Sequence, residues 1–134
     1  MGKRYLKVAA VYFTIGVLLG FVMGIAQDFR LASVHAHINL LGWVSMALFG
    51  IIYHFYPNAA ETKVAKTQFW LHNIGIPVMQ GGIAFEILTG ITAVLPLIIV
   101  GSILVVVSVL LFTINVFKYV NKTSSKEVNN NLSV

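Results

Sequence analysis

The sequence predicts an all-α integral membrane protein, because three observations point the same way. Of the 134 residues, 58% are hydrophobic and 10% are charged, whereas a soluble domain carries about 25% charged residues. Four apolar runs are each long enough to cross, as a helix, a hydrocarbon core about 30 Å thick. The runs lack the alternating pattern of a membrane-spanning strand. We therefore expect four transmembrane helices in one domain.

The four predicted helices are separated by polar or turn-forming segments, and they span residues 6–26, 33–56, 68–90 and 95–119. Asp28 and Arg30 separate the first two helices, and the polar segment 57–66 separates the second from the third. Residues 88–96, LTGITAVLP, divide the third from the fourth, where Pro96 suits the first turn of a helix.

The basic residues predict that both chain ends face the cytoplasm. Lys and Arg concentrate in the cytoplasmic loops of membrane proteins, and here all but Arg30 lie on one side of the predicted helices: Lys3, Arg4, Lys7, Lys63, Lys66, Lys118, Lys122 and Lys126. Because they flank apolar runs, they do not indicate nucleic-acid binding. We expect a multi-pass plasma-membrane protein with a four-helix domain over residues 1–121 and a disordered cytoplasmic tail over residues 122–134.

Small residues indicate faces of close helix packing. Gly16, Gly20 and Gly24 form a double small-xxx-small pattern in the first helix, although glycine enrichment is also common in membrane helices. The third helix carries a stripe of five residues at helical spacing: His72, Gly75, Met79, Gly82 and Glu86. Such a stripe must face protein, water or a cofactor.

Two histidines, His35 and His37, lie two residues apart inside the second predicted helix. Positions i and i+2 of a helix are about 200° apart, so the two rings point to opposite faces and do not readily ligate one metal ion together. Each can ligate a different one. A histidine in a membrane helix can also simply hydrogen-bond across helices or lie near the headgroups, but two on opposed faces weaken that alternative.

The two faces of this helix differ in character. The face of His35 carries small, polar and aromatic residues, namely Asn39, Gly42, Met46, Phe49 and Tyr53. The face of His37 carries mainly large apolar residues that suit a flat macrocycle, namely Leu41, Val44, Leu48, Ile52 and Phe55. The predicted topology puts both histidines near the outer membrane surface, with Glu86 at a similar level. It puts His54 and His72 near the inner surface, too far away to join them.

Cysteine is absent, which excludes disulfides and thiolate ligands for a metal or a haem. Any metal must therefore be held by histidine, methionine, carboxylate or backbone groups.

The segment HAHINLLGWVSMALFGIIYHFYP, residues 35–57, resembles the tenth transmembrane helix of subunit I of the haem-copper oxidases and nitric oxide reductases. That helix opens with an H-x-H pair near the outer membrane face and continues through small residues. The segment KTQFWLHNIGIPVMQGG, residues 66–82, looks like the next helix of the family, in which an FW pair precedes an I-G step. The resemblance covers residues 33–92.

The resemblance implies a role for each histidine. His35 would ligate a high-spin, gas-binding haem, and His37 would ligate a low-spin haem on the other side of the helix. Haem b is the implied cofactor, with copper as a second metal, and Arg30 is the one basic residue on the outer side for a haem propionate. His72 and Glu86 are further candidate metal ligands. The chain departs from the family in lacking its copper-ligating His-Pro-Glu-Val-Tyr stretch.

Four helices are also fewer than the family's twelve or so. Subunit I of the family is built from three arcs of four helices, and this chain resembles the last arc. A homotrimer would rebuild the full ring as a closed cyclic assembly, with each haem between protomers.

We therefore expect a haem b-binding membrane protein that transfers electrons from a redox donor, or binds or reduces nitric oxide or oxygen. If it turns over, it is an oxidoreductase. The alternatives are a non-enzymatic nitric oxide sensor, a copper- or haem-handling subunit that adds Met79 and Glu86 to the histidines, and a structural subunit without a cofactor.

Overall fold

The computed structural model describes residues 1–120, so the tail predicted over residues 122–134 lies outside the described residues. Within residues 1–120 the chain is helical and has no strand. The elements in chain order are α1 (Gly2–Ala26), α2 (Ala32–His37), η1 (Ile38–Val44), α3 (Ser45–Phe55), α4 (Pro57–Ala60), α5 (Lys63–Thr89), η2 (Thr92–Val94) and α6 (Leu95–Tyr119).

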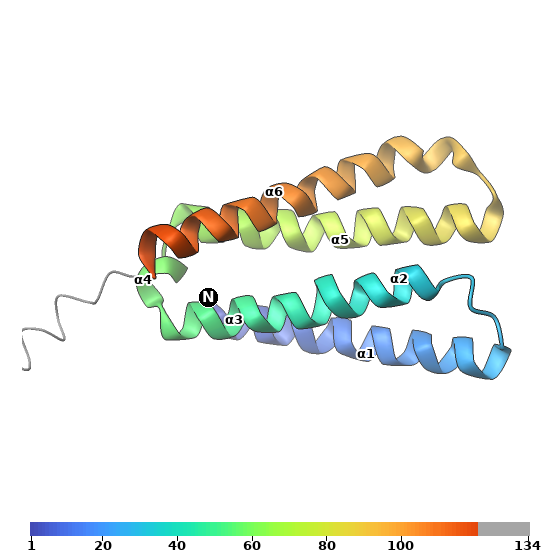
Figure 1. The fold of residues 1–134 in the computed structure, drawn as a ribbon, viewed down its shortest axis with the longest axis horizontal. Helices are drawn as coiled ribbons and strands as arrows, with labels where there is room; N and C mark the ends of the chain where they lie inside the picture. The colour runs from blue at the N-terminus through green and yellow to red at the C-terminus, as the bar shows by residue number, and fades with distance from the viewer. Residues whose placement is uncertain (121–134) are drawn as a thin grey trace, which may run out of the picture.

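The elements form two helical hairpins that lie along each other (Figure 1). The first hairpin pairs α1 with α2, η1 and α3, and the second pairs α5 with α6, which make the most extensive contact in the molecule. The short helix α4 joins the hairpins at the end where α1 begins. Contacts between the hairpins are sparser, and they include α5 with α2 and with η1.

Three helical segments are long and apolar enough to cross a membrane: Gly2–Ala26, Ala32–Phe55 and Thr92–Tyr119. The sequence predicts four spans, and α5 is indeed a helix of 27 residues. However, polar side chains lower its apolarity along its whole length, namely Lys63, Lys66, Gln68, His72, Asn73, Gln80 and Glu86. By length and composition the described structure therefore has three spans.

Two helices begin earlier than predicted. Helix α1 begins at Gly2 and not at residue 6, and α5 begins at Lys63 and not at residue 68. The side chain of Thr62 caps α5 by accepting a hydrogen bond of 3.0 Å from the Ala65 amide. The predicted connection over residues 57–66 is therefore mostly helical, because Pro57 starts α4 in its first turn.

The second span is not uniform. Between α2 and α3, the seven residues of η1 form a π-helix, in which each amide bonds to the carbonyl five residues earlier. At its end, the Ser45 amide bonds to the Leu40 carbonyl. The sequence predicts a plain helix here, so this wider segment, which starts directly after His37, is a correction to that prediction.

A buried hydrogen-bond network holds the two hairpins together near α4. Asn115 of α6 donates to the Tyr53 hydroxyl over 3.2 Å and to the Ala59 carbonyl over 2.8 Å. The hydroxyl groups of Tyr5 and Tyr53 both contact Oε1 of Gln68 on α5. These side chains are almost fully buried, and the network satisfies most of their polar atoms, although Nε2 of Gln68 has no hydrogen-bond partner within residues 1–120.

Large apolar side chains cover much of the outer surface. On α1, Phe21 is 63% exposed, and on α6, Phe117 is 80% exposed. A soluble monomer rarely exposes apolar patches of this extent. The exposure is compatible with a membrane protein.

Candidate functional site

His37 lies on the outside of the hairpin, with its side chain exposed. Its Nδ1 is 2.7 Å from the Ser33 carbonyl oxygen, so Nδ1 carries the proton and donates to that oxygen. In the neutral ring, the lone pair is then on Nε2, which has no hydrogen-bond partner within residues 1–120. Metal-ligating histidines use this arrangement, in which the second nitrogen donates to a carbonyl and fixes the ring.

His35 is half-buried and faces α1. Its ring rests on Gly20, where an added Cβ would lie 2.8 Å from Cε1 of His35. Asn39 rests on Gly16 in the same way, with 2.6 Å between an added Cβ and Oδ1. Its amide nitrogen also lies 2.9 Å from the His35 carbonyl oxygen and 3.4 Å from Nδ1. Two of the three glycines predicted to pack closely therefore do so, and the site around His35 is filled by protein.

The two histidines lie on different faces, as their spacing predicts. His35 faces α1, whereas the side chain of His37 is exposed. Further along the same span, the residues predicted to share the face of His35, namely Met46, Phe49 and Tyr53, are buried, and Leu48 and Phe55 on the other face are exposed. The structure therefore does not bring His35 and His37 together.

His72 is fully buried, and both of its ring nitrogens have protein partners. Nε2 lies 3.0 Å from the Leu41 carbonyl oxygen in η1, and Nδ1 lies 2.6 Å from the Ser108 hydroxyl on α6. The Leu41 carbonyl can only accept, so Nε2 carries the proton and donates to it, while the Ser108 hydroxyl, which donates to the Val105 carbonyl over 2.8 Å, lies against Nδ1. His72 thereby joins α5 and α6 to the second span.

The π-helix explains why the Leu41 carbonyl can accept from His72. In an α-helix this oxygen would accept from the amide of Ser45, four residues later. That amide bonds instead to the Leu40 carbonyl, so Leu41 needs another donor. The Nε2 atom of His72 supplies it, and the ring is held in place by an edge-to-face contact with Phe49 at 5.2 Å between centroids.

The depth of His72 differs from the sequence prediction. The predicted topology put His72 near the inner surface, too far from His37 to share its level. Because His72 contacts Leu41, the two histidines are separated by about 6 Å along the helix axis, at 1.5 Å per residue. The reason is that α5 begins five residues before the predicted start at residue 68.

The stripe of five residues on α5, from His72 to Glu86, faces α6. An added Cβ at Gly75 would lie 2.9 Å from Val105, and one at Gly82 would lie 2.6 Å from Ile98. Met79, between them, is buried where its backbone touches Gly101 of α6. Most of the stripe is therefore a helix-packing surface, and Glu86 at its end is half-buried.

Arg30 lies in the connection between α1 and α2 and is exposed. Its Nη2 forms an ion pair of 2.7 Å with Asp28. Hydrogen bonds from the Arg30 side chain are the main reason that the pKa of Asp28 falls to about 2, and the pKa of Arg30 is raised by the same pair. Arg30 is thus already partnered, five residues before His35.

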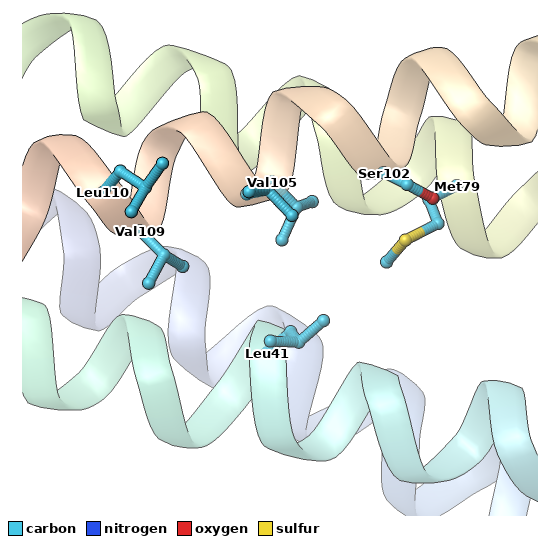
Figure 2. Close-up of a pocket in the computed structure, with 7 residues that line it drawn as sticks. Leu41, Met79, Ser102, Val105, Val109 and Leu110 are labelled. Carbon is cyan, nitrogen blue, oxygen red and sulfur yellow. The ribbon is translucent and has the colours of Figure 1, made fainter.

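An apolar pocket of about 350 Å³ opens between the two hairpins. Figure 2 shows Leu41 on one side and Met79, Val105 and Val109 on the other. Ser102 also lines it, but its hydroxyl donates to the Ile98 carbonyl of its own helix. The walls offer no polar group for a ligand, and the pocket adjoins the π-helix.

Sequence reasoning missed several residues of this region. Ser108 and Leu41 are partners of His72 that no motif indicates. Gln80 is 3% exposed, and neither of its amide atoms has a hydrogen-bond partner within residues 1–120. A glutamine in a long predicted membrane helix is itself a signal, because such polar groups are costly to bury unless they are paired.

Over the described range 1–120, no three His, Asp or Glu side chains gather where they could hold one metal ion. The chain matches no protein-family model, and it matches none of the curated proteins and none of the solved structures. None of these comparisons links the chain to the haem-copper oxidases.

Proposed function

We propose that the protein binds haem b in a membrane and that His37 ligates the haem iron. The observation that carries this proposal is the state of the His37 ring: exposed on the outer face, with Nδ1 fixed by the Ser33 carbonyl and Nε2 left with its lone pair. Haem iron is held by imidazole in many cytochromes, and a single ligand per chain suffices to anchor it.

The surface beside His37 suits a flat, apolar macrocycle. Leu40, Trp43 and Val44 are all exposed on the following turns, with Leu40 at 61%. Arg30, at the start of the same hairpin arm, is a basic group for a haem propionate, which would have to compete with Asp28. The protein surface is therefore apolar beside His37, and Arg30 supplies a basic group at the edge of that surface.

The second axial ligand would come from another copy of the chain. We propose a closed homotrimer in the plasma membrane, with both termini cytoplasmic and with α5 as a fourth span. The polar side of α5, which includes Gln68 and His72, is buried against the other helices. Apolar residues such as Trp70 and Ile74 are therefore left on the outer side of α5. Haem held by imidazole on both sides would transfer electrons from a redox donor.

His35 takes a different part in this proposal from the one that the resemblance implies. Its ring is packed on Gly20 and filled in by Asn39, so a haem on that face would have to separate the second span from α1. We propose that His37 is the ligand and that His35 supports the helix. A copper site would need ligands from several copies.

The test is the absorption spectrum of the full chain, expressed with ample haem and purified in mild detergent. The proposal predicts a Soret band, with sharp α and β bands after reduction. A colourless preparation that takes up no added haem would contradict it.

A gas-binding protein is the second candidate, and the apolar pocket favours it. Cavities with apolar walls take up small apolar molecules, and this one lies one turn from His37 beside Leu41. Carbon monoxide or nitric oxide would then shift the Soret band of the reduced protein, whereas haem with two imidazole ligands would show no shift.

A further inference from the structure

A basic pocket lies at the end of the bundle where α1 begins and α4 joins the hairpins (Figure 1). Two overlapping hollows, of about 400 Å³ and about 610 Å³, share Met1, Arg4, Ala60 and Glu61 in their walls. Lys3 and His54 line the first hollow, and Lys66 lines the second. Three separate elements, α1, α3 and α5, thus bring basic side chains to one place.

The charges in this pocket are not balanced. Among the lining side chains, Lys3, Arg4 and Lys66 carry three positive charges and Glu61 carries one negative charge, which leaves a net charge of +2 when histidine is counted as neutral. Within residues 1–120, the ion pair that the structure forms is at the opposite end of the bundle, between Asp28 and Arg30. Among the described residues, none of the cations of the pocket forms an ion pair, although Glu61 lines the same walls.

The start of α1 adds to the positive potential. This helix of 25 residues has no acidic residue in its first turn and no side-chain cap. The unpaired amides at a helix N-terminus act as a partial positive charge, next to which cations are unfavourable and anions are stabilising. Lys3 and Arg4 lie in this turn. An anion in the pocket would therefore be attracted by these two side chains and by the helix N-terminus.

Exposed apolar side chains lie close in sequence to residues that line the pocket, namely Arg4, His54 and Pro57. Leu6 of α1 is 44% exposed, Phe55 is 71% exposed and Tyr56 is 41% exposed. A phospholipid could contact both groups of side chains, with its phosphate near the cations of the pocket and its acyl chains against the exposed apolar side chains. Arginine binds phosphate through two parallel hydrogen bonds, and basic pockets at the ends of membrane helices hold anionic headgroups. We propose that this pocket binds the phosphate of an anionic phospholipid.

The experiment uses the full chain, purified in a zwitterionic detergent. Phosphatidylglycerol and phosphatidylcholine with the same acyl chains are added in separate titrations, and binding is followed by the rise in thermal unfolding temperature. We expect saturable stabilisation by phosphatidylglycerol and little effect of phosphatidylcholine. The double variant Arg4→Gln, Lys66→Gln should bind phosphatidylglycerol more weakly by about fivefold for each charge removed.

The matched control is the double variant Lys7→Gln, Lys118→Gln. It removes the same charge at the same end of the bundle, from side chains that do not line the pocket. If both double variants lose affinity equally, the attraction is a general charge effect and the proposal is wrong. If inorganic phosphate at millimolar concentration displaces the lipid completely, the ligand is a soluble phosphate. Lys66→Gln alone serves if the double variant does not fold, as judged by circular dichroism.

Discussion

At the scale of single residues, the proposed function depends on which nitrogen atom of each histidine is left for a ligand. His37 donates from Nδ1 to a backbone carbonyl and keeps Nε2 for coordination. His72 uses both nitrogens within the protein. Sequence spacing predicts the opposed faces of His35 and His37, because the helical repeat fixes direction. It does not predict these partners, because they depend on contacts between helices.

The ion pair at Asp28 gives a prediction on pH. The pKa of this exposed carboxyl is lowered from 3.8 to about 2, so the pair stabilises the folded chain above pH 4 and is lost as the pH falls through about 2. In carbon-detected NMR, the signal of the Asp28 carboxyl should titrate in that range. In the Arg30→Gln variant, the titration should return toward the ordinary range; an unchanged midpoint would show that Arg30 is not the cause.

At the scale of helices, the sequence predicts what depends on apolar length and misses what depends on neighbours. The apolar runs give all four long helices within a few residues. The early start of α5 depends on the Thr62 cap, which is a local signal that the polar segment obscures. The π-helix leaves the Leu41 carbonyl to accept from His72, 31 positions away, so no local pattern reports this contact.

His72 should matter to stability far more than an exposed histidine does. His72→Phe leaves the Leu41 carbonyl without its donor in an apolar setting, which costs about 1–3 kcal/mol in the free energy of unfolding. The control is His54→Phe, which changes an exposed ring at the end of α3. Unfolding by sodium dodecyl sulfate measures both variants. Equal stability of the two would contradict the proposed contact of His72 with the π-helix.

The contact between α5 and α6 can be tested with two alanines. A Cβ at Gly101 would lie 2.5 Å from the backbone nitrogen of Met79, whereas one at Gly81 meets nothing within 4 Å. Both substitutions gain the same helix propensity. We expect Gly101→Ala to lower the free energy of unfolding by about 1–3 kcal/mol and Gly81→Ala to be neutral or stabilising. Equal effects would mean that the helices are not so close.

At the scale of the whole molecule, one chain supplies one exposed histidine that we propose as a haem ligand, and a large exposed apolar surface. The proposed four-span trimer would account for both features, because a closed cyclic assembly brings the same faces of every copy into contact. The proposal of a trimer rests on the family resemblance of the sequence. The spacing of residues along the chain does not indicate which of them contact another copy.

The mass of the detergent-solubilised particle tests the trimer. We expect a detergent-corrected mass of three chains of 14.7 kDa each, measured by light scattering or native mass spectrometry. A mass of one or two chains would remove the trimer, although His37 could still ligate haem in a smaller particle.

The most direct test of the central proposal compares two histidine variants by the spectrum of the reduced protein. His37→Ala removes the proposed ligand, and His54→Ala removes an exposed histidine that lies 17 positions further along the same span. We predict that His54→Ala keeps the sharp α band, that His37→Ala loses it, and that added imidazole restores it in the His37 variant. A full spectrum in His37→Ala without imidazole would contradict the assignment of His37 as the haem ligand.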